Sequence, residues 1–204
     1  MFFVHDLLVT HFSYVLPRRT PWYTLPVIYD PATKKIISNS RDIAEYLDQQ
    51  YPTTQKLVLD PAFETEWEEV FLTNAVKTFP GSTFMVLHNR VSLPAAQHIR
   101  RIREAQFGET LENLSTKEAV SQQWKAFENG FTNLSEFYKK SGTTFLSKGD
   151  APAWADLVVG SWMISQKFIY GEDSKQWEDI LKWDGELWKT LNEALQVYEG
   201  DVLE

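Results

Sequence analysis

The sequence predicts two parts of different fold class, an α+β N-terminal part followed by an all-α helical bundle. Two short apolar runs at residues 25–29 and 36–37, separated by turn-forming residues, indicate a β-hairpin. From Pro61 onward strand patterns disappear, and helical patterns follow one another to the end of the chain. We therefore expect a ββα N-terminal part over residues 1–52 and a helical bundle over residues 61–204.

The first 16 residues have apolar side chains four apart, at Val4, Leu8, Phe12 and Leu16, which fits one amphipathic helix. The segment has no basic start and its longest uninterrupted apolar run is four residues. We therefore expect neither a secretory signal nor a membrane span here.

In the hairpin, Pro26 cannot donate a ladder hydrogen bond, so it marks a strand end or an edge. The backbone groups beside it, those of Leu25, are then free to pair with an extended, peptide-like ligand. The alternative is that Pro26 merely ends a strand, because edge prolines are common.

A helix follows the hairpin and carries Ile43, Ala44 and Leu47 on one face. Ser40 is its expected N-cap. Free N–H groups at a helix start, together with a serine hydroxyl, favour a bound carboxylate. The alternative is that Ser40 only caps the helix.

The predicted bundle contains a helix over residues 61–78, stopped at Pro80, and one over residues 94–107, stopped at Gly108. Residues 115–118 read as a capping box that starts a long helix. Its apolar stripe recurs at alternating steps of four and three, at Val120, Trp124, Phe127, Phe131, Leu134 and Tyr138.

The segment 153–169 is apolar on nearly every side and is expected to be the buried central helix. Asp156 is expected to cap its backbone without a hydroxyl partner, because residue 153 is an alanine. A last helix carries Leu187, Leu191, Leu195 and Tyr198.

Composition limits the function classes. The 204 residues are 43% hydrophobic and carry a net charge of −8, with a pI near 5.1. An acidic chain argues against nucleic acid or an anionic membrane as partner, since both need basic patches. The absence of cysteine, with only four histidines, predicts no disulfide framework and no metal site. We expect a cytoplasmic protein.

The chain has eight tryptophans, eight tyrosines and thirteen phenylalanines. Most are expected to be core packing, as for Trp124 in the long stripe. Trp67 and Phe71, one turn apart on the predicted helix nearest the hairpin part, are the candidates to line a pocket for an apolar aromatic molecule.

Taken together, these motifs resemble the glutathione S-transferases, in particular the fungal (basidiomycete) etherase-like group. The resemblance rests on residues 23–31, 44–48 with 51–52, 100–108, 152–157 and 171–174. It implies a thioredoxin-like N-terminal domain in which Leu25, Pro26, Asn39 and Ser40 bind glutathione, with Ser40 receiving the γ-glutamyl carboxylate. It also implies a dimer, and a detoxification role by glutathione conjugation to apolar aromatic electrophiles or glutathione-dependent ether cleavage.

The chain departs from this family pattern at two places. Asn39 stands where the family usually has an acidic residue, so the charge facing the glutathione amino group is lost. Only 24 residues precede Leu25, fewer than a β–α–β unit needs, so the thioredoxin-like domain is expected to be incomplete or atypical. No residue matches the thiol-activating position, and nothing places Ser13 or Tyr14 there.

Three hypotheses follow. The first is a glutathione transferase. The second is a catalytically impaired protein that binds glutathione or another ligand, or an incomplete form that lacks the thiol-activating residue. The third is an interaction or scaffold domain, which predicts an exposed apolar face where the missing strands normally lie, and concentration-dependent self-association.

Overall fold

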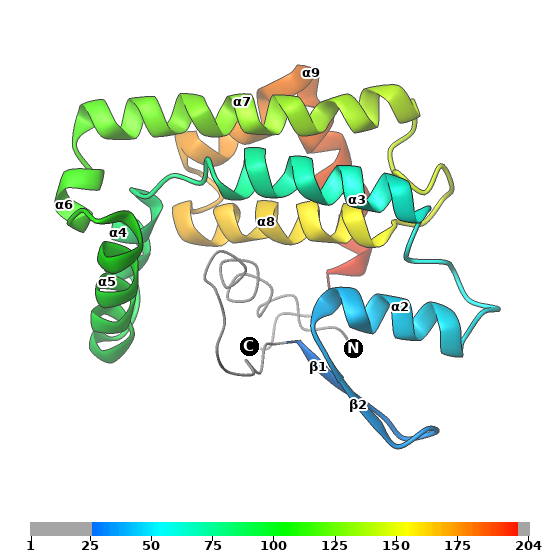
Figure 1. The fold of residues 1–204 in the computed structure, drawn as a ribbon. Helices are drawn as coiled ribbons and strands as arrows, with labels where there is room; N and C mark the ends of the chain where they lie inside the picture. Colours follow the sequence, from blue (N-terminus) through cyan, green and yellow to red (C-terminus); the bar gives the residue numbers. More distant parts are fainter. Residues whose placement is uncertain (1–25, 200–204) are drawn as a thin grey trace. The chain divides into compact units, whose positions relative to one another are not determined.

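The hairpin predicted near the N-terminus is present in the computed structural model, which describes residues 26–199. Strand β1 (Val27–Asp30) pairs antiparallel with β2 (Lys35–Ser38), with Val27 opposite Ser38 and Tyr29 opposite Ile36. Helix α2 (Ser40–Gln50) follows directly, which gives the expected ββα order (Figure 1). The helix predicted over residues 1–16, and Leu25, lie outside the described residues.

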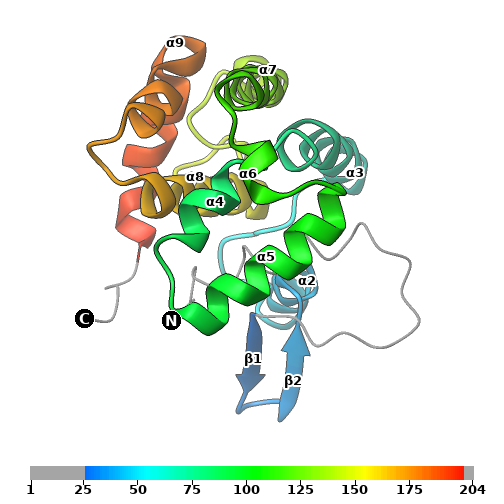
Figure 2. The same cartoon turned by 90° about the vertical axis from the view of Figure 1, so that its left-hand side faces the viewer.

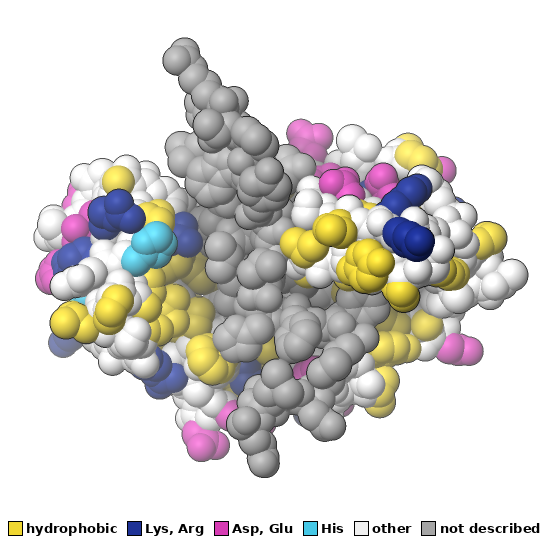
Figure 3. Space-filling model, turned by 90° about the horizontal axis from the view of Figure 1, so that it is seen from below, with side chains coloured by type: hydrophobic (Ala, Val, Ile, Leu, Met, Phe, Trp, Pro, Cys, Tyr) yellow, Lys and Arg dark blue, Asp and Glu magenta, His cyan; other side chains and the backbone are white. Residues whose placement is uncertain are grey.

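The hairpin exposes apolar side chains on one face. Val27, Tyr29 and Ile36 are 46%, 60% and 73% exposed. They share a face because β1 residues two apart point the same way and Ile36 lies opposite Tyr29. Figure 3 shows hydrophobic side chains beside Lys and Arg on the surface that carries the hairpin. Ile43 and Ala44 of α2, by contrast, are each 3% exposed.

Helices joined by loops make up the rest of the described chain (Figure 1). They are α3 (Pro61–Val70), continued by a π-helix η3 (Phe71–Val76), α4 (Thr83–His88), α5 (Leu93–Phe107), α6 (Leu111–Leu114), α7 (Lys117–Ser141), α8 (Trp154–Tyr170), α9 (Lys175–Leu195) and a 3₁₀ turn η4 (Gln196–Tyr198).

Most of the predicted helices are confirmed. The segment predicted as one helix over residues 61–78 is α3 with η3, and α5 ends at Gly108, which adopts φ 70° as a left-handed cap. The short helices α4 and α6 were not predicted, because four to six residues carry too little periodicity to recognise.

Two details differ from the sequence prediction. Helix α7 is capped by Thr116, whose Oγ1 accepts the N–H of Ala119 at 3.3 Å, one residue later than the predicted capping box. Helix α9 is interrupted between Trp183 and Glu186, where Asp184, Gly185 and Glu186 have φ of 53°, 72° and 65°. The predicted last helix is thus the second half of α9, in which Leu191 and Leu195 are buried.

The described chain divides into two compact units. The first unit contains residues 26–68, 137–165 and 188–199, and the second contains residues 69–136 and 166–187. Helices α3, α7, α8 and α9 each contribute residues to both units because the boundaries fall inside them.

The core of the first unit is built around α8. Its buried residues include Val158, Trp162 and Met163, each no more than 1% exposed, which confirms the predicted buried helix. Gly160 lies against Leu195 of α9, where a Cβ would stand 2.5 Å from the Leu195 Cδ1. This close approach explains a glycine in an otherwise large-residue helix.

The core of the second unit is aromatic. Phe127 and Phe131 of α7 meet edge-to-face with ring centroids 4.8 Å apart, and Trp183 of α9 contacts both, at 5.9 and 5.8 Å. These contacts confirm the predicted stripe in this part of α7. Figures 1 and 2 both show α4 beside α5 in this unit.

Gly130 of α7 also belongs to the second unit and faces η3. A Cβ at this position would overlap the carbonyl oxygen of Asn74 and lie 2.7 Å from Thr78 Oγ1. The glycine therefore allows the two helices to approach closely where the π-helical turn bulges.

Candidate functional site

The start of β1 is joined to the start of α2 by a backbone hydrogen bond. The N–H of Asn39 donates to the carbonyl oxygen of Pro26 at 3.2 Å. This bond extends the β1–β2 ladder by one step beyond the Val27 and Ser38 pair. We call Pro26, Asn39 and Ser40, which it brings together, the β1–α2 junction.

Asn39 is the N-cap of α2, one residue earlier than the predicted cap at Ser40. Its side-chain Oδ1 accepts the N–H of Arg41 at 3.2 Å, and its carbonyl accepts the N–H of Ile43 at 2.9 Å. Its φ is 79°, a region that asparagine tolerates better than most residues. The amide oxygen expected to face a ligand is thus also the capping group of the helix.

Ser40 is the first residue of α2 and is half-buried. Within residues 26–199, the backbone N–H groups of Ser40 and Asp42 and the Ser40 hydroxyl have no hydrogen-bond partner. They lie at the positive end of the helix dipole, where an anionic group is stabilised. The junction can therefore accept a carboxylate.

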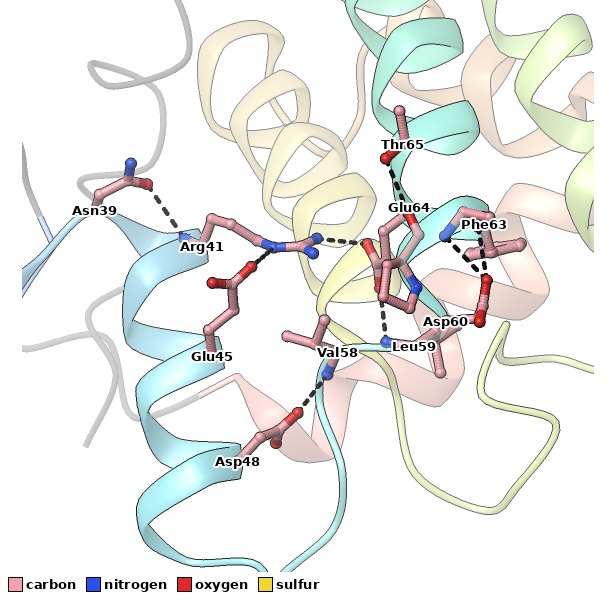
Figure 4. A network of polar contacts seen from close by, with 12 residues as sticks. Asn39, Arg41, Glu45, Asp48, Val58, Leu59, Asp60, Phe63, Glu64 and Thr65 are labelled. Atoms are coloured by element: carbon pink, nitrogen blue, oxygen red, sulfur yellow. Dashed lines mark hydrogen bonds and ion pairs between the residues drawn. The ribbon is translucent and has the colours of Figure 1, made fainter.

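Arg41 does not supply the charge for such an anion. Its guanidinium binds Glu45 and Glu64, each at 2.7 Å (Figure 4). It also lies 4.9 Å from the ring centroid of Trp154. Glu64 is 1% exposed and also accepts the N–H of Leu59 at 2.9 Å. This network fixes α2 against α3 and α8 within the first unit, and so fixes the junction.

Asp48 of α2 holds the connection between the hairpin part and the helices. Its two carboxylate oxygens accept the N–H groups of Leu57 and Val58, both at 2.8 Å. The carbonyl of Leu57 in turn accepts the N–H of Trp154 at 2.8 Å. Figure 4 shows the Asp48 bond to Val58 beside the Arg41 network.

A buried carboxylate, Asp30, locks the hairpin turn onto α2. It is 6% exposed and accepts hydrogen bonds from the hydroxyls of Tyr46, Tyr51 (2.9 Å) and Thr33 (3.0 Å), and from the N–H of Ala32 (2.8 Å). The Tyr46 bond is the largest of the influences that hold the pKa of Asp30 well below its usual range.

Asp156 caps α8 through the backbone, as predicted. It accepts the N–H of Ala153 at 2.8 Å and that of Leu146 at 3.1 Å, and no hydroxyl stands at residue 153. Burial raises the pKa of Asp156 to about 6, although the two backbone hydrogen bonds act in the opposite direction.

The two predicted pocket residues are both in the protein interior. Trp67 of α3 is 0% exposed and meets Trp154 edge-to-face, with ring centroids 5.7 Å apart. Phe71 of η3 is 1% exposed. Both are therefore packing residues, and their part in a pocket for an aromatic molecule stays a prediction.

Over residues 26–199, no group of three or more His, Asp or Glu side chains is placed to hold a metal ion. In the same range, no helix has the length and apolar character needed to cross a membrane.

Sequence reasoning missed the Arg41 network and the Asp30 cluster. Arg41 and Glu45 are four apart on one helix, which signals their ion pair. Nothing local signals the bond from Arg41 to Glu64, because 23 residues separate them. The same holds for Asp30 with Tyr46, 16 residues apart.

Two family models match the chain. The C-terminal domain of glutathione S-transferases matches residues 59–198, and the N-terminal domain of glutathione S-transferases matches residues 4–55. Comparison with curated proteins gave no match.

Solved structures of fungal transferases are similar over most of the chain. One from Ceriporiopsis subvermispora, a glutathione S-transferase in complex with glutathione, is 31% identical with a TM-score of 0.77, and the match covers 87% of this chain and 72% of that one. A second glutathione complex from the same fungus is 29% identical with a TM-score of 0.80, covering 92% and 76%. A glutathione transferase of Phanerochaete chrysosporium is 25% identical with a TM-score of 0.75, covering 87% and 72%.

The hairpin with its following helix, the helices from residue 61 onward and the two matching domain models agree with one another. On this evidence the chain belongs to the glutathione S-transferase family.

Proposed function

We propose that this chain binds glutathione at the β1–α2 junction. The observation that carries the proposal is the open N-terminal end of α2, where the N–H groups of Ser40 and Asp42 and the Ser40 hydroxyl have no partner among the described residues. A γ-glutamyl carboxylate would accept these donors. The two relatives crystallised with glutathione support the identity of the ligand.

The rest of glutathione would lie along the free end of β1. In the proposal, the backbone of Leu25 pairs with the peptide part of the ligand, and Pro26 leaves that edge open because it has no N–H. The Asn39 amide faces the glutathione amino group, but without the charge that a carboxylate would bring. Binding should therefore be weaker than with an acidic residue at this position.

The reaction we propose is conjugation of glutathione to an apolar aromatic electrophile, or glutathione-dependent cleavage of an aromatic ether. The thiolate sulfur attacks the electrophilic carbon and forms a C–S bond. The leaving group departs with the electron pair of the broken bond and takes up a proton. Trp67 and Phe71 are the residues proposed to line the acceptor pocket.

A second candidate is a protein that binds glutathione without turnover. Asn39 favours this candidate, because its side-chain oxygen already accepts the N–H of Arg41 as the cap of α2, and because the side chain carries no charge. This candidate shares the ligand site with the first and differs in lacking thiolate formation, which is the chemically demanding step near neutral pH.

Calorimetric titration with glutathione tests the site. Ser40→Ala should weaken binding by about tenfold, the effect of losing a hydrogen bond to a charged group. Ser92→Ala is the matched control. Ser92 also begins a helix, is exposed and makes no side-chain capping bond, so its removal should leave glutathione affinity unchanged.

Turnover separates the two candidates. The transferase predicts release of the leaving group from an activated aryl halide or aryl ether when glutathione is present, with Ser40→Ala reducing the rate at low glutathione. The binding protein predicts the same calorimetric result with no product above the uncatalysed rate. Equal glutathione affinity for wild type and Ser40→Ala would contradict both.

We further propose an organisation in two domains, residues 1–52 and 61–204, in a cytoplasmic homodimer. The ranges of the two family models support the division. Sedimentation velocity across a range of protein concentrations tests the dimer.

A further inference from the structure

The hairpin has two faces, and α2 contacts one of them. On that face the Tyr46 hydroxyl of α2 donates to Asp30, and the Nζ of Lys35, the residue directly opposite Asp30, lies 5.6 Å from the centroid of the Tyr46 ring. Successive side chains of a strand alternate between the two faces of the sheet. The other face, which we call the outer face of the hairpin, is therefore formed by Val27, Tyr29 and Ile36.

The outer face is apolar and open among the described residues. Its three side chains are 46% to 73% exposed, whereas Ile43 and Ala44 of α2 are each 3% exposed. Within residues 26–199, α2 is the helix that makes extensive contact with both strands. An apolar face of a sheet is stable in water only when another element covers it. The outer face therefore needs a covering element.

A second copy of the chain fits so small a surface poorly. A stable interface between two proteins buries about 800 Å² on each partner, from about 20–30 residues a side. The outer face offers three apolar side chains. An element of the same chain can use a smaller surface, because it is already tethered and its association costs only loop-closure entropy.

The chain supplies such an element immediately before the hairpin. Residues 1–25 lie outside the described residues and lead directly into Pro26, the residue before β1. Their sequence predicts an amphipathic helix. The family model of the N-terminal domain matches residues 4–55 as one range, which assigns this segment and the hairpin to the same domain. The apolar stripe of the predicted helix consists of Val4, Leu8, Phe12 and Leu16.

The connection is long enough for this segment to reach the outer face. Residues 17–25 join the stripe to Pro26, and an extended chain of this length spans about 30 Å. A helix over residues 4–16 is about 20 Å long. Each hairpin strand has four residues and is about 13 Å long. One helix of this length can therefore cover both strands.

We propose that residues 4–16 form a helix whose apolar stripe packs on the outer face, so that the hairpin lies between this helix and α2. The packing removes Tyr29 and Ile36 from water and closes the outer face to other molecules. The proposal does not depend on glutathione binding, because the outer face shares no residue with the β1–α2 junction.

Disulfide trapping tests the contact, because the natural chain contains no cysteine. Leu8→Cys or Phe12→Cys, each combined with Ile36→Cys in the full chain, should form a disulfide within one chain under mild oxidation. Peptide mass spectrometry after digestion identifies the bond. Thr10→Cys with Ile36→Cys is the matched control, since Thr10 lies on the side of the predicted helix opposite the stripe. It should form much less of the disulfide.

Hydrogen exchange gives a second readout without cysteine. Peptides covering residues 4–16 should be protected in wild type and should lose this protection in Ile36→Asp. Leu93→Asp is the control, because Leu93 of α5 is 71% exposed and Ile36 is 73% exposed. It should leave the protection unchanged. Unchanged exchange in peptides of α8 shows that Ile36→Asp retains the fold.

Three results would overturn the proposal. They are fast exchange of residues 4–16 in wild type, protection that Ile36→Asp leaves intact, and equal disulfide yields from the stripe pairs and the Thr10 pair. Disulfides that form mainly between chains, with Ile36→Asp lowering the sedimentation coefficient, would assign the outer face to a second copy and would also overturn it.

Discussion

Asp30 shows how one residue shapes the proposed glutathione site without touching a ligand. Its carboxylate is bonded by hydroxyls from the turn and from α2, so it fixes the hairpin on the helix whose start we propose to bind glutathione. We expect Asp30→Asn to lower the unfolding temperature, because an amide replaces an acceptor that four donors share. Asp173→Asn, an exposed turn residue, is the control and should change little.

The pH dependence of that effect has a defined sign. The pKa of Asp30 is lower in the folded state than its ordinary value of about 4. Its stabilisation is therefore complete above about pH 5 and is lost as pH falls below about 4. The difference in unfolding free energy between wild type and Asp30→Asn should shrink in that acidic range, and a difference that grew on acidification would refute this role.

Asp156 should behave in the opposite way. Burial raises its folded pKa to about 6, so between about pH 4 and 6 the unfolded chain loses this proton before the folded one does. Wild type should then lose on the order of 2–3 kcal/mol relative to Asp156→Asn as pH rises from about 4 to 7. Urea unfolding at several pH values measures this, and a flat difference would show that the folded pKa is ordinary.

At the scale of elements, the position of α2 depends on one ion pair. Glu64 is buried and Arg41 is its cation, so Arg41→Met leaves a buried charge unpaired. We expect a loss of about 3–5 kcal/mol of unfolding free energy. Arg101→Met, at an exposed position of α5, should cost less than about 0.5 kcal/mol.

The double variant Arg41→Met with Glu64→Gln tests the cause. Glutamine removes the unpaired charge and can still accept the N–H of Leu59. The double variant should therefore lose at least about 1 kcal/mol less than the sum of the single variants. Simple additivity would mean that the two side chains act independently.

An element was predicted more completely when its repeat of apolar positions is longer. The 25-residue α7 and the apolar α8 repeat their apolar positions over many turns, so they were predicted nearly to their ends. The observed N-caps of α2 and α7 each lie one residue from the predicted ones. Asn39 and Ser40, like Ser115 and Thr116, are adjacent residues that can each cap, and only the backbone conformation selects between them.

At the scale of the whole molecule, the contacts that could not be predicted are those between residues far apart in the sequence. Arg41 meets Glu64 across 23 positions, and Asp30 meets Tyr46 across 16. By contrast, the junction residues Pro26, Asn39 and Ser40 were predicted together from the family resemblance. They lie together because a hairpin of short strands returns the chain to its starting point. The predicted site is local in the sequence, and the missed ones are not.

The central claim is that glutathione binds at the β1–α2 junction, and hydrogen exchange measured by mass spectrometry tests it most directly. The amides of Ser40 and Asp42 have no acceptor within the described residues, so they should exchange fast in the free protein. We predict that glutathione slows exchange in peptides covering residues 38–44 in wild type and in Ser92→Ala, and much less in Ser40→Ala. Unchanged exchange in these peptides at saturating glutathione, or protection confined to other segments, would contradict the claim.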